Sequence, residues 1–471
     1  MRYLFRLLCV CTLSVMPLVG CSETTGDGGT GGVGGTGGVG GDGGTEPMER
    51  AWGTPERIDS EGSVQQPGEL AVSAGGAAIS VWLDWDSLLW TQGYVPDEGW
   101  GTAQRMELGG GFPSSAPPPQ VAIASDGTAM LVWLEQQPDA IWATRYTPGG
   151  GWEALARLDR GFEAYSVSGP DVAMDESGRA IATWRRSSDG GSVFASRYKP
   201  ESGWSEAQRI DEPSAGWGYE TRVAMNAAGD AIAVWKGDDG NSRHVFANKY
   251  APATGWGTST PLDDASDTFI EAPLQVAIDS RGNGIVVWHQ EYYGELPYPT
   301  SSRITANRYT SESGWEGAAP IEGDEQSSSY LPDVATSLDG TAIVVWMRSG
   351  VDGGVFAMHY VSGTGWAPEA LIFEYPFTGT DIAPRVAANA AGQALAIWRA
   401  FDSEQTVWSS HFIPSAGWDA AVKVNVPLGS CSEPQVGIDG EGNGIAVWAQ
   451  STASDSVCYA NHYAVDEAPR R

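Results

Sequence analysis

The chain has 471 residues, among them 62 glycines and 21 tryptophans, with a net charge of −32 and only 18% charged residues. So many tryptophans argue against a disordered chain, because disordered sequences are poor in aromatic residues. The negative charge argues against nucleic acid and anionic lipid surfaces as partners, since both attract basic proteins. High Gly and Trp with few charges is typical of short strands joined by tight turns, so we expect an all-β fold.

Residues 1–20 are predicted to be a signal peptide. Arg2 and Arg6 form a basic start, and the apolar stretch that follows is too short to span a bilayer as a helix. It ends in Leu18-Val19-Gly20-Cys21, which resembles the lipobox of bacterial lipoproteins. The resemblance implies cleavage before Cys21 and acylation of Cys21. Ser22 at the next position implies the outer membrane, with the protein facing either the periplasm or the outside.

Residues 21–49 are predicted to be a tether between the lipidated Cys21 and the folded part. Glycine dominates residues 26–44, and it loses too much backbone entropy on folding for such a run to pack. A coil of this length and composition spans roughly 30 Å. We therefore expect the globular part to be held away from a membrane.

Internal repetition dominates the rest of the sequence. Each repeat unit carries one tryptophan at the end of an apolar run and a second one after Gly or Ala, near the unit's end. The first tryptophans, which number the units 1 to 8, are Trp82, Trp133, Trp184, Trp235, Trp288, Trp346, Trp398 and Trp448. The second tryptophans are Trp52, Trp100, Trp152, Trp204, Trp256, Trp315, Trp366 and Trp418.

Each unit is predicted to contain four strands, A to D, with the first tryptophan on strand B and the second on strand D. Four-stranded units of about 50 residues are typical of β-propeller blades. A lone strand D at residues 51–59 precedes unit 1, and unit 8 ends after strand C. We therefore predict a single eight-bladed β-propeller over residues 50–466, closed by the N-terminal strand, with a C-terminal tail at 467–471. A pair of stacked sandwiches is the less favoured alternative, because it leaves the lone strand unexplained.

Two cysteines remain after removal of the signal peptide and acylation of Cys21. Cys431 and Cys458 both belong to unit 8. Because exported compartments are oxidising, we predict a disulfide between them that fastens the closing blade. Two buried free thiols are the alternative.

No catalytic or metal-binding motif emerges from the sequence. It has no nucleophile elbow and no zinc motif, and its Asp-Gly-Gly turns lack the alternating oxygen ligands of a calcium loop. The repeated motif of sialidases, which are also propellers, is not matched in spacing. His359, His411 and His462 occupy a repeat position that holds Arg or Lys in other units, so a structural role is expected for them. We expect no cofactor and no metal.

A series of acids follows the strand D tryptophans at a fixed distance of seven residues. This acidic rim comprises Asp59, Glu107, Asp159, Asp211, Asp263 and Glu322. The rim has two interpretations: a focused negative field around one edge of the ring, or carboxylates that bond backbone amides at strand ends. The periodicity favours the second, because functional sites tend to break symmetry.

Aromatic residues outside the repeat positions fall in or beside the B–C and D–A connections, which lie on one face of a propeller. The candidate binding residues among them are Trp85, Tyr165, Trp217, Tyr219, Tyr292, Tyr293, Tyr298, Tyr330 and Tyr375. Aromatics on variable loops over a rigid scaffold favour ligand recognition. The alternative is that they only pack the longer loops.

These features favour a membrane-anchored binding module that recognises a glycan or an exported protein through its aromatic loop face. We expect a monomer that contacts the membrane through Cys21. One alternative is a hydrolase or lyase acting on polysaccharide, and another is a structural component of the envelope. The sequence resembles exported bacterial lipoproteins with tandem Trp-rich propeller repeats, a resemblance that carries no catalytic residues.

Overall fold

The computed structural model divides the chain into two units, Met1–Pro47 and Met48–Arg471. The described residues belong to the second unit. They are residues 50–465 without 60–63, 67, 107–117, 137–138, 162–165, 188–190, 213–216, 239–242, 264–267, 294–298, 324–327, 351, 376–381, 402–404, 426–428, 433 and 452–455. The predicted signal peptide, tether, Cys21 and tail therefore lie outside the described residues.

All regular elements in the described part of the chain are β-strands, four types per repeat unit as predicted. Strand A of the eight units is formed by β3 (Val64–Gln66) with β4 (Leu70–Val72), β9 (Gln120–Ile123), β14 (Val167–Met174), β19 (Trp217–Met225), β24 (Thr268–Ile278), β29 (Ser328–Thr336), β34 (Arg385–Ala388), and β39 (Ser430–Cys431) with β40 (Gln435–Ile438). Strand B is formed by β5 (Ala78–Asp84), β10 (Ala129–Glu135), β15 (Ala180–Arg186), β20 (Ala231–Asp238), β25 (Gly284–Tyr293), β30 (Ala342–Ser349), β35 (Ala394–Phe401) and β41 (Gly444–Ser451).

The two outer strand types follow in the same order. Strand C is formed by β6 (Leu89–Val95), β11 (Ala140–Thr147), β16 (Val193–Lys199), β21 (Arg243–Ala251), β26 (Pro299–Thr310), β31 (Gly354–Val361), β36 (Gln405–Ile413) and β42 (Ser456–Val465). Strand D is split into β7 (Gly99–Trp100) and β8 (Gln104–Arg105), β12 (Gly151–Trp152) and β13 (Ala156–Arg157), β17 (Gly203–Trp204) and β18 (Gln208–Arg209), β22 (Gly255–Trp256) and β23 (Thr260–Pro261), β27 (Gly314–Trp315) and β28 (Ala319–Pro320), β32 (Gly365–Trp366) and β33 (Ala370–Glu374), β37 (Gly417–Trp418) and β38 (Val422–Lys423), and β1 (Arg50–Trp52) and β2 (Glu56–Arg57).

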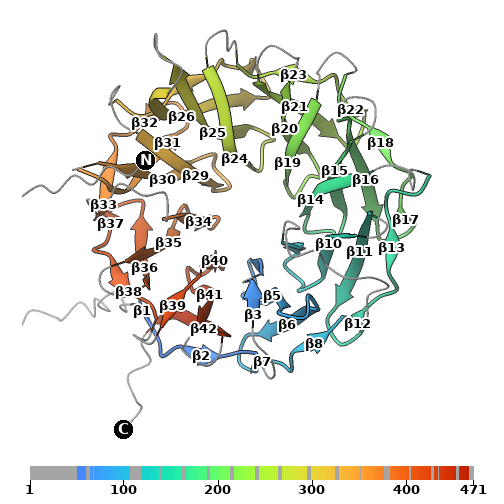
Figure 1. Ribbon diagram of the computed structural model, residues 1–471, viewed down its shortest axis with the longest axis horizontal. Coiled ribbons are helices and arrows are strands. Elements are labelled where there is room, and N and C mark those ends of the chain that lie inside the picture. The colour runs from blue at the N-terminus through green and yellow to red at the C-terminus, as the bar shows by residue number, and fades with distance from the viewer. Residues whose placement is uncertain are drawn as a thin grey trace, which may run out of the picture. The chain divides into compact units, whose positions relative to one another are not determined.

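Strands A to D of each unit pair antiparallel in sequence order, and the A strands lie innermost (Figure 1). Each A strand contacts the A strands of the neighbouring units, in the order β4, β9, β14, β19, β24, β29, β34, β40 and back to β4. The prediction of an all-β propeller is confirmed. The predicted count of eight blades agrees with this cyclic order of contacts.

The N-terminal strand closes the ring, as predicted. β1 pairs antiparallel with β42, with Trp52 opposite Tyr463, and β2 pairs with the other half of β42. The ring centroids of Trp52 and Tyr463 lie 5.4 Å apart. The same contact between the strand C aromatic and the strand D tryptophan occurs in each of the seven other units. Chain start and chain end thus form one sheet, and β42 has no open edge.

The core lies between neighbouring units and is built on the strand B tryptophans. All eight are at most 2% exposed. Trp235, for example, stacks on Phe246 of strand C at 6.2 Å and packs against Ile181 and Val193 of the preceding unit. Strand B is apolar on both faces because each face meets another blade.

Candidate functional site

The acidic rim is a structural device in the described units. Asp159, Asp211, Asp263 and Glu322 each accept a hydrogen bond from a backbone amide of strand C in their own unit, at 2.7–3.1 Å. Asp59 does the same for Cys458 across the ring closure, at 2.9 Å. Glu107 lies outside the described residues.

Burial explains why the rim sets up no open negative field. The side chains of Asp159 and Glu322 are fully buried, and Asp59 is only 5% exposed as a residue. Arg57 and Arg157 pair with the acids two positions after them. For the five described acids, the interpretation as backbone-bonding carboxylates is therefore the one that the geometry supports.

The predicted disulfide between Cys431 and Cys458 is wrong, because both residues are free and buried cysteines. Cys431 on β39 lies opposite Gln450 of β41, whereas Cys458 on β42 lies opposite Ala449 of the same strand. With β41 between them, the two cysteines are two strand spacings apart, roughly 9.5 Å, which exceeds the reach of a disulfide. They also pack into different core clusters, on opposite sides of the blade.

Burial keeps both thiols protonated. It raises the pKa of Cys431 to about 12, against a hydrogen bond from Asn425 to its sulfur at 3.1 Å. Burial also raises the pKa of Cys458, and the Asp59 charge acts in the same direction. Both residues are therefore inert apolar fillers of the closing blade.

The predicted aromatic candidates fall into three groups. Trp85 is 62% exposed at the B–C turn of unit 1. Tyr292, Tyr330 and Tyr375 are half-buried. The remaining five have no described side chain: Tyr165 and Tyr298 lie outside the described residues, and only the backbone is described for Trp217, Tyr219 and Tyr293.

The half-buried tyrosines differ in what holds them. Tyr375 exchanges hydrogen bonds with the backbone of Phe401 and stacks on Phe373, so it packs its own loop. Tyr330 instead meets the imidazole of His289 edge-on, with ring centroids 4.9 Å apart. Tyr330 thus stands beside a histidine that lies outside the repeat pattern.

The inner strands carry a polar position that the sequence analysis missed. Thirteen residues before each strand B tryptophan stands a charged or amide side chain, although apolar residues follow it. These central-ring residues are Glu69, Gln120, Asp171, Arg222, Gln275, Asp333, Arg385 and Gln435. All are half-buried except Asp171, which is 7% exposed. Reading the repeats as an aligned column would have revealed them, since this column is polar throughout although its charges differ from unit to unit.

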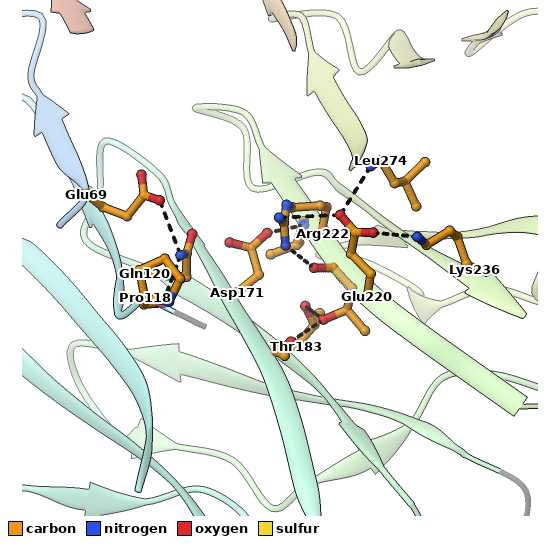
Figure 2. A network of polar contacts seen from close by, with 12 residues as sticks. Glu69, Pro118, Gln120, Asp171, Thr183, Glu220, Arg222, Lys236 and Leu274 are labelled. Carbon is orange, nitrogen blue, oxygen red and sulfur yellow. Dashed lines mark hydrogen bonds and ion pairs between the residues drawn. The ribbon is translucent and has the colours of Figure 1, made fainter. Parts of the chain in front are cut away.

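The central ring departs furthest from symmetry in units 3 and 4. Figure 2 shows Arg222 of β19 between Asp171 of β14 and Glu220 of β19, with Lys236 of β20 beyond Glu220. Lys236 pairs with Glu220 at 2.8 Å, and Arg222 approaches the same carboxylate at 3.5 Å. Glu220 also accepts a hydrogen bond from the amide of Leu274 in the next unit, at 3.2 Å. Two cations and two acids thus gather on the innermost strands β14 and β19 and on β20, which is strand B of unit 4.

The backbone at this cluster combines a repeat feature with a rarer one. The A–B ladder shifts register between Tyr219 and Thr221, as the ladders of β14, β24 and β29 do at the matching place, and Glu220 within this bulge has a φ of +33°. A non-glycine residue in the left-handed region costs about 1 kcal/mol or more and persists where surrounding contacts enforce it. The ion pairs of Glu220 are such contacts.

The pKa values of the two acids in the cluster are shifted in opposite directions. Burial raises the pKa of Asp171 to about 6, although Arg222 and the amide of Val223 oppose the rise. Burial acts on Glu220 too, but there Lys236 and Arg222 outweigh it, so the pKa of Glu220 is lowered. Such a split pair holds one group that takes up a proton near pH 6 and one that stays ionised at that pH.

Asp171→Asn is expected to stabilise the protein above pH 6 and to leave it unchanged near pH 4. The unfolded chain has an Asp pKa near 3.8, so the folded state binds this proton more tightly and loses stability as the pH rises from about 4 past 6. Asparagine keeps an oxygen for the Val223 amide and carries no charge, which should yield about 1–3 kcal/mol at pH 7.5. Urea unfolding of both proteins across this pH range measures the free energy of unfolding. If the difference in this free energy between the two proteins is the same at pH 4 and pH 7.5, the pKa of Asp171 is not raised in the folded state.

In the part of the chain that the structure describes, no group of three His, Cys, Asp or Glu side chains is placed to hold a metal ion. The described residues also include no helix long and apolar enough to cross a membrane.

The fold and the inner-strand cluster define a β-propeller with a polar centre, and solved structures similar to it are propellers that bind or act on glycans. The polysaccharide lyase Uly1 shares 11% identity, with 90% of this chain and 93% of that chain covered and a TM-score of 0.51. The BP39L lectin from Burkholderia pseudomallei shares 12% identity, with 76% and 99% covered and a TM-score of 0.50. An α-L-arabinanase from Penicillium chrysogenum shares 10% identity, with 74% and 93% covered and a TM-score of 0.41. No family model and no curated protein matches the chain. At these identities the similarity shows the fold.

Proposed function

We propose that this protein is a glycan-binding propeller, anchored to the bacterial envelope through a lipid on Cys21 and acting as a monomer. The observation that carries the proposal is the break in symmetry on the A and B strands of units 4 to 6. There Lys236, Glu220 and Arg222 form one group in unit 4, and His289 of unit 5 with Tyr330 of unit 6 forms another.

This set of side chains suits a sugar ligand. Aromatic rings offer flat apolar faces for the C–H groups of a pyranose, while guanidinium, ammonium and carboxylate groups bond its hydroxyls and acidic substituents. The B–C and D–A connections leave the blades at the same ends of the strands, and Trp85 is exposed on that face. A rigid scaffold with chemically varied groups at one end is the usual design of recognition proteins. The lectin and lyase neighbours fit this proposal.

Affinity electrophoresis of a chain that begins at Met48, in gels containing neutral or uronate-rich polysaccharides, tests the proposal. We expect retardation by at least one polysaccharide, and loss of retardation in the double variant Trp85→Ala with Tyr330→Ala. The matched control is Leu338→Ala, another exposed apolar residue, at an A–B turn on the opposite face. Absence of retardation by every polysaccharide, or equal retardation of the double variant at unchanged melting temperature, would overturn it.

A polysaccharide lyase or hydrolase is the second candidate, favoured by the opposite pKa shifts of Asp171 and Glu220. In that case Glu220, ionised beside Arg222 and Lys236, acts as the base or nucleophile, and Asp171 supplies a proton. Incubation with the same polysaccharides, followed by assays for reducing ends and for unsaturated products, separates the two candidates. Turnover that disappears in Glu220→Gln supports the enzyme, and binding without turnover supports the recognition module.

A further inference from the structure

Neighbouring units are joined by a stack that repeats around the ring. The residue before the strand C aromatic reaches across the junction and lies against the corresponding aromatic of the next unit. Six contacts of this kind are Arg197 on Tyr250, Lys249 on Tyr309, Arg308 on Tyr360, His359 on Phe412, His411 on Tyr463 and His462 on Tyr94. In unit 2 the same position is Arg145, which pairs with Glu153 and lies close enough to influence the pKa of Tyr198. At these junctions a cationic or imidazole side chain thus stands near the aromatic ring of the next unit.

The junction between units 1 and 2 lacks this side chain because the position is Gly93. A Cβ built on Gly93 would point toward the hydroxyl of Tyr146 at 3.8 Å, so the glycine leaves open the space that a cation fills elsewhere. A cavity of about 320 Å³ lies there. Two aromatic pairs line it, Tyr94 with Trp100 and Tyr146 with Trp152.

The cavity carries polar groups suited to a positively charged ligand. The carboxylates of Glu98 and Asp126 stand at its exposed rim. Deeper in, Gln92 is 6% exposed and donates one hydrogen bond to the carbonyl of Gly101, while its Oε1 atom has no hydrogen-bond partner among the described residues. A buried carbonyl oxygen without a donor is costly, so this atom calls for a ligand with an N–H or O–H group or for the partial charge of an ammonium.

We propose that this junction is a binding site for an organic cation, an ammonium or guanidinium group that takes the place of the missing repeat side chain over Tyr146. The ring faces attract the cation through their quadrupoles, and the rim carboxylates and Gln92 Oε1 complete its surroundings. The site lies on the face of the A–B and C–D turns, since Gly127 and Pro148 also line it. It is separate from the inner-strand cluster and does not depend on the proposed glycan function.

Isothermal titration of the chain that begins at Met48 with choline tests the site, with the neutral isostere of choline, in which carbon replaces the ammonium nitrogen, as the matched ligand. We expect one choline per chain and at least about tenfold weaker binding of the isostere, because only the cation gains from the ring quadrupoles. Equal binding of both compounds, or no binding of choline, would overturn the proposal.

Gly93→Arg is the decisive variant because it restores the side chain type of units 2, 3 and 5. The position has ordinary contacts for a Cβ and no left-handed φ, so the arginine is expected to fit. Choline binding should fall at least about tenfold while the melting temperature holds or rises.

Tyr146→Leu should also lose choline binding, whereas Tyr309→Leu, at a junction already filled by Lys249, should keep it. Unchanged choline binding in both Gly93→Arg and Tyr146→Leu would place the ligand elsewhere and refute the site. Polysaccharide retardation of Gly93→Arg stays as in the parent chain, so the two proposals fail independently.

Discussion

A chain that begins at Ser60 is expected to fold poorly and aggregate, whereas a chain that begins at Met48 is expected to be as stable as the full mature protein. The longer deletion removes β1 and β2 and with them Ile58 and Asp59, which are 4% and 5% exposed. Strand β42 is left with unpaired backbone groups along its edge, and the amide of Cys458 loses its carboxylate. Lost apolar burial and hydrogen bonds together should cost at least about 5 kcal/mol.

Urea unfolding and size-exclusion chromatography of the two chains measure this effect. Addition of a peptide covering residues 48–59 to the shorter chain should restore part of the stability, because the strand binds only to the folded ring. Equal unfolding midpoints for the two chains would contradict the closure of the ring by its first strand.

Arg348→Met is expected to destabilise the protein by about 3–5 kcal/mol. The guanidinium of Arg348 forks between Glu322 at 2.9 Å and Glu369 at 2.7 Å, and it lies 4.0 Å over the ring of Phe356. The Glu322 side chain is fully buried, so removal of the arginine leaves a buried acid without its cation. Chemical unfolding at neutral pH measures the loss.

Two further variants make the Arg348 result specific to buried charge. Arg348→Met combined with Glu322→Gln should recover much of the lost stability, because the amide still accepts the hydrogen bond of the Ile304 amide and carries no charge. Arg145→Met breaks a more exposed pair with Glu153 and should cost only about 0.5 kcal/mol. If both single arginine variants lose the same free energy, the buried pair contributes no more than a surface pair.

The repeat made the fold predictable from the sequence. The spacing of Trp82, Trp133 and their equivalents defined the strands, and the lone strand around Trp52 required closure by the chain start. The acids after the strand D tryptophans were also interpretable, because a position that is acidic in six of the eight units is most simply structural. Because the same spacing of tryptophans occurs in eight units, each unit supports the strand assignment made from the others.

The site was harder to predict because the residue type at its positions differs from unit to unit, so the repeat pattern does not indicate a role for them. Cys431 and Cys458 share a blade, but the sequence did not show that β41 runs between them. Glu220, Arg222 and Lys236 stand on two strands, and their pairing depends on the register of β19 against β20, which the repeat spacing does not reveal. Gly93 looked like an ordinary strand residue, since a missing side chain becomes visible only against the stacks of the other junctions.

Ring closure also sets the order of events during folding. Hydrogen bonds that join Asp59 to Cys458 and Gly53 to Asn461 connect residues about 400 positions apart, so they cannot form before the chain has been synthesised at least as far as Asn461. Until then β1 and β2 have no partner strand, because both pair with β42. Two complete chains that fold at high concentration can each donate this N-terminal strand to the other's β42, which predicts exchange dimers as the characteristic misfolded product.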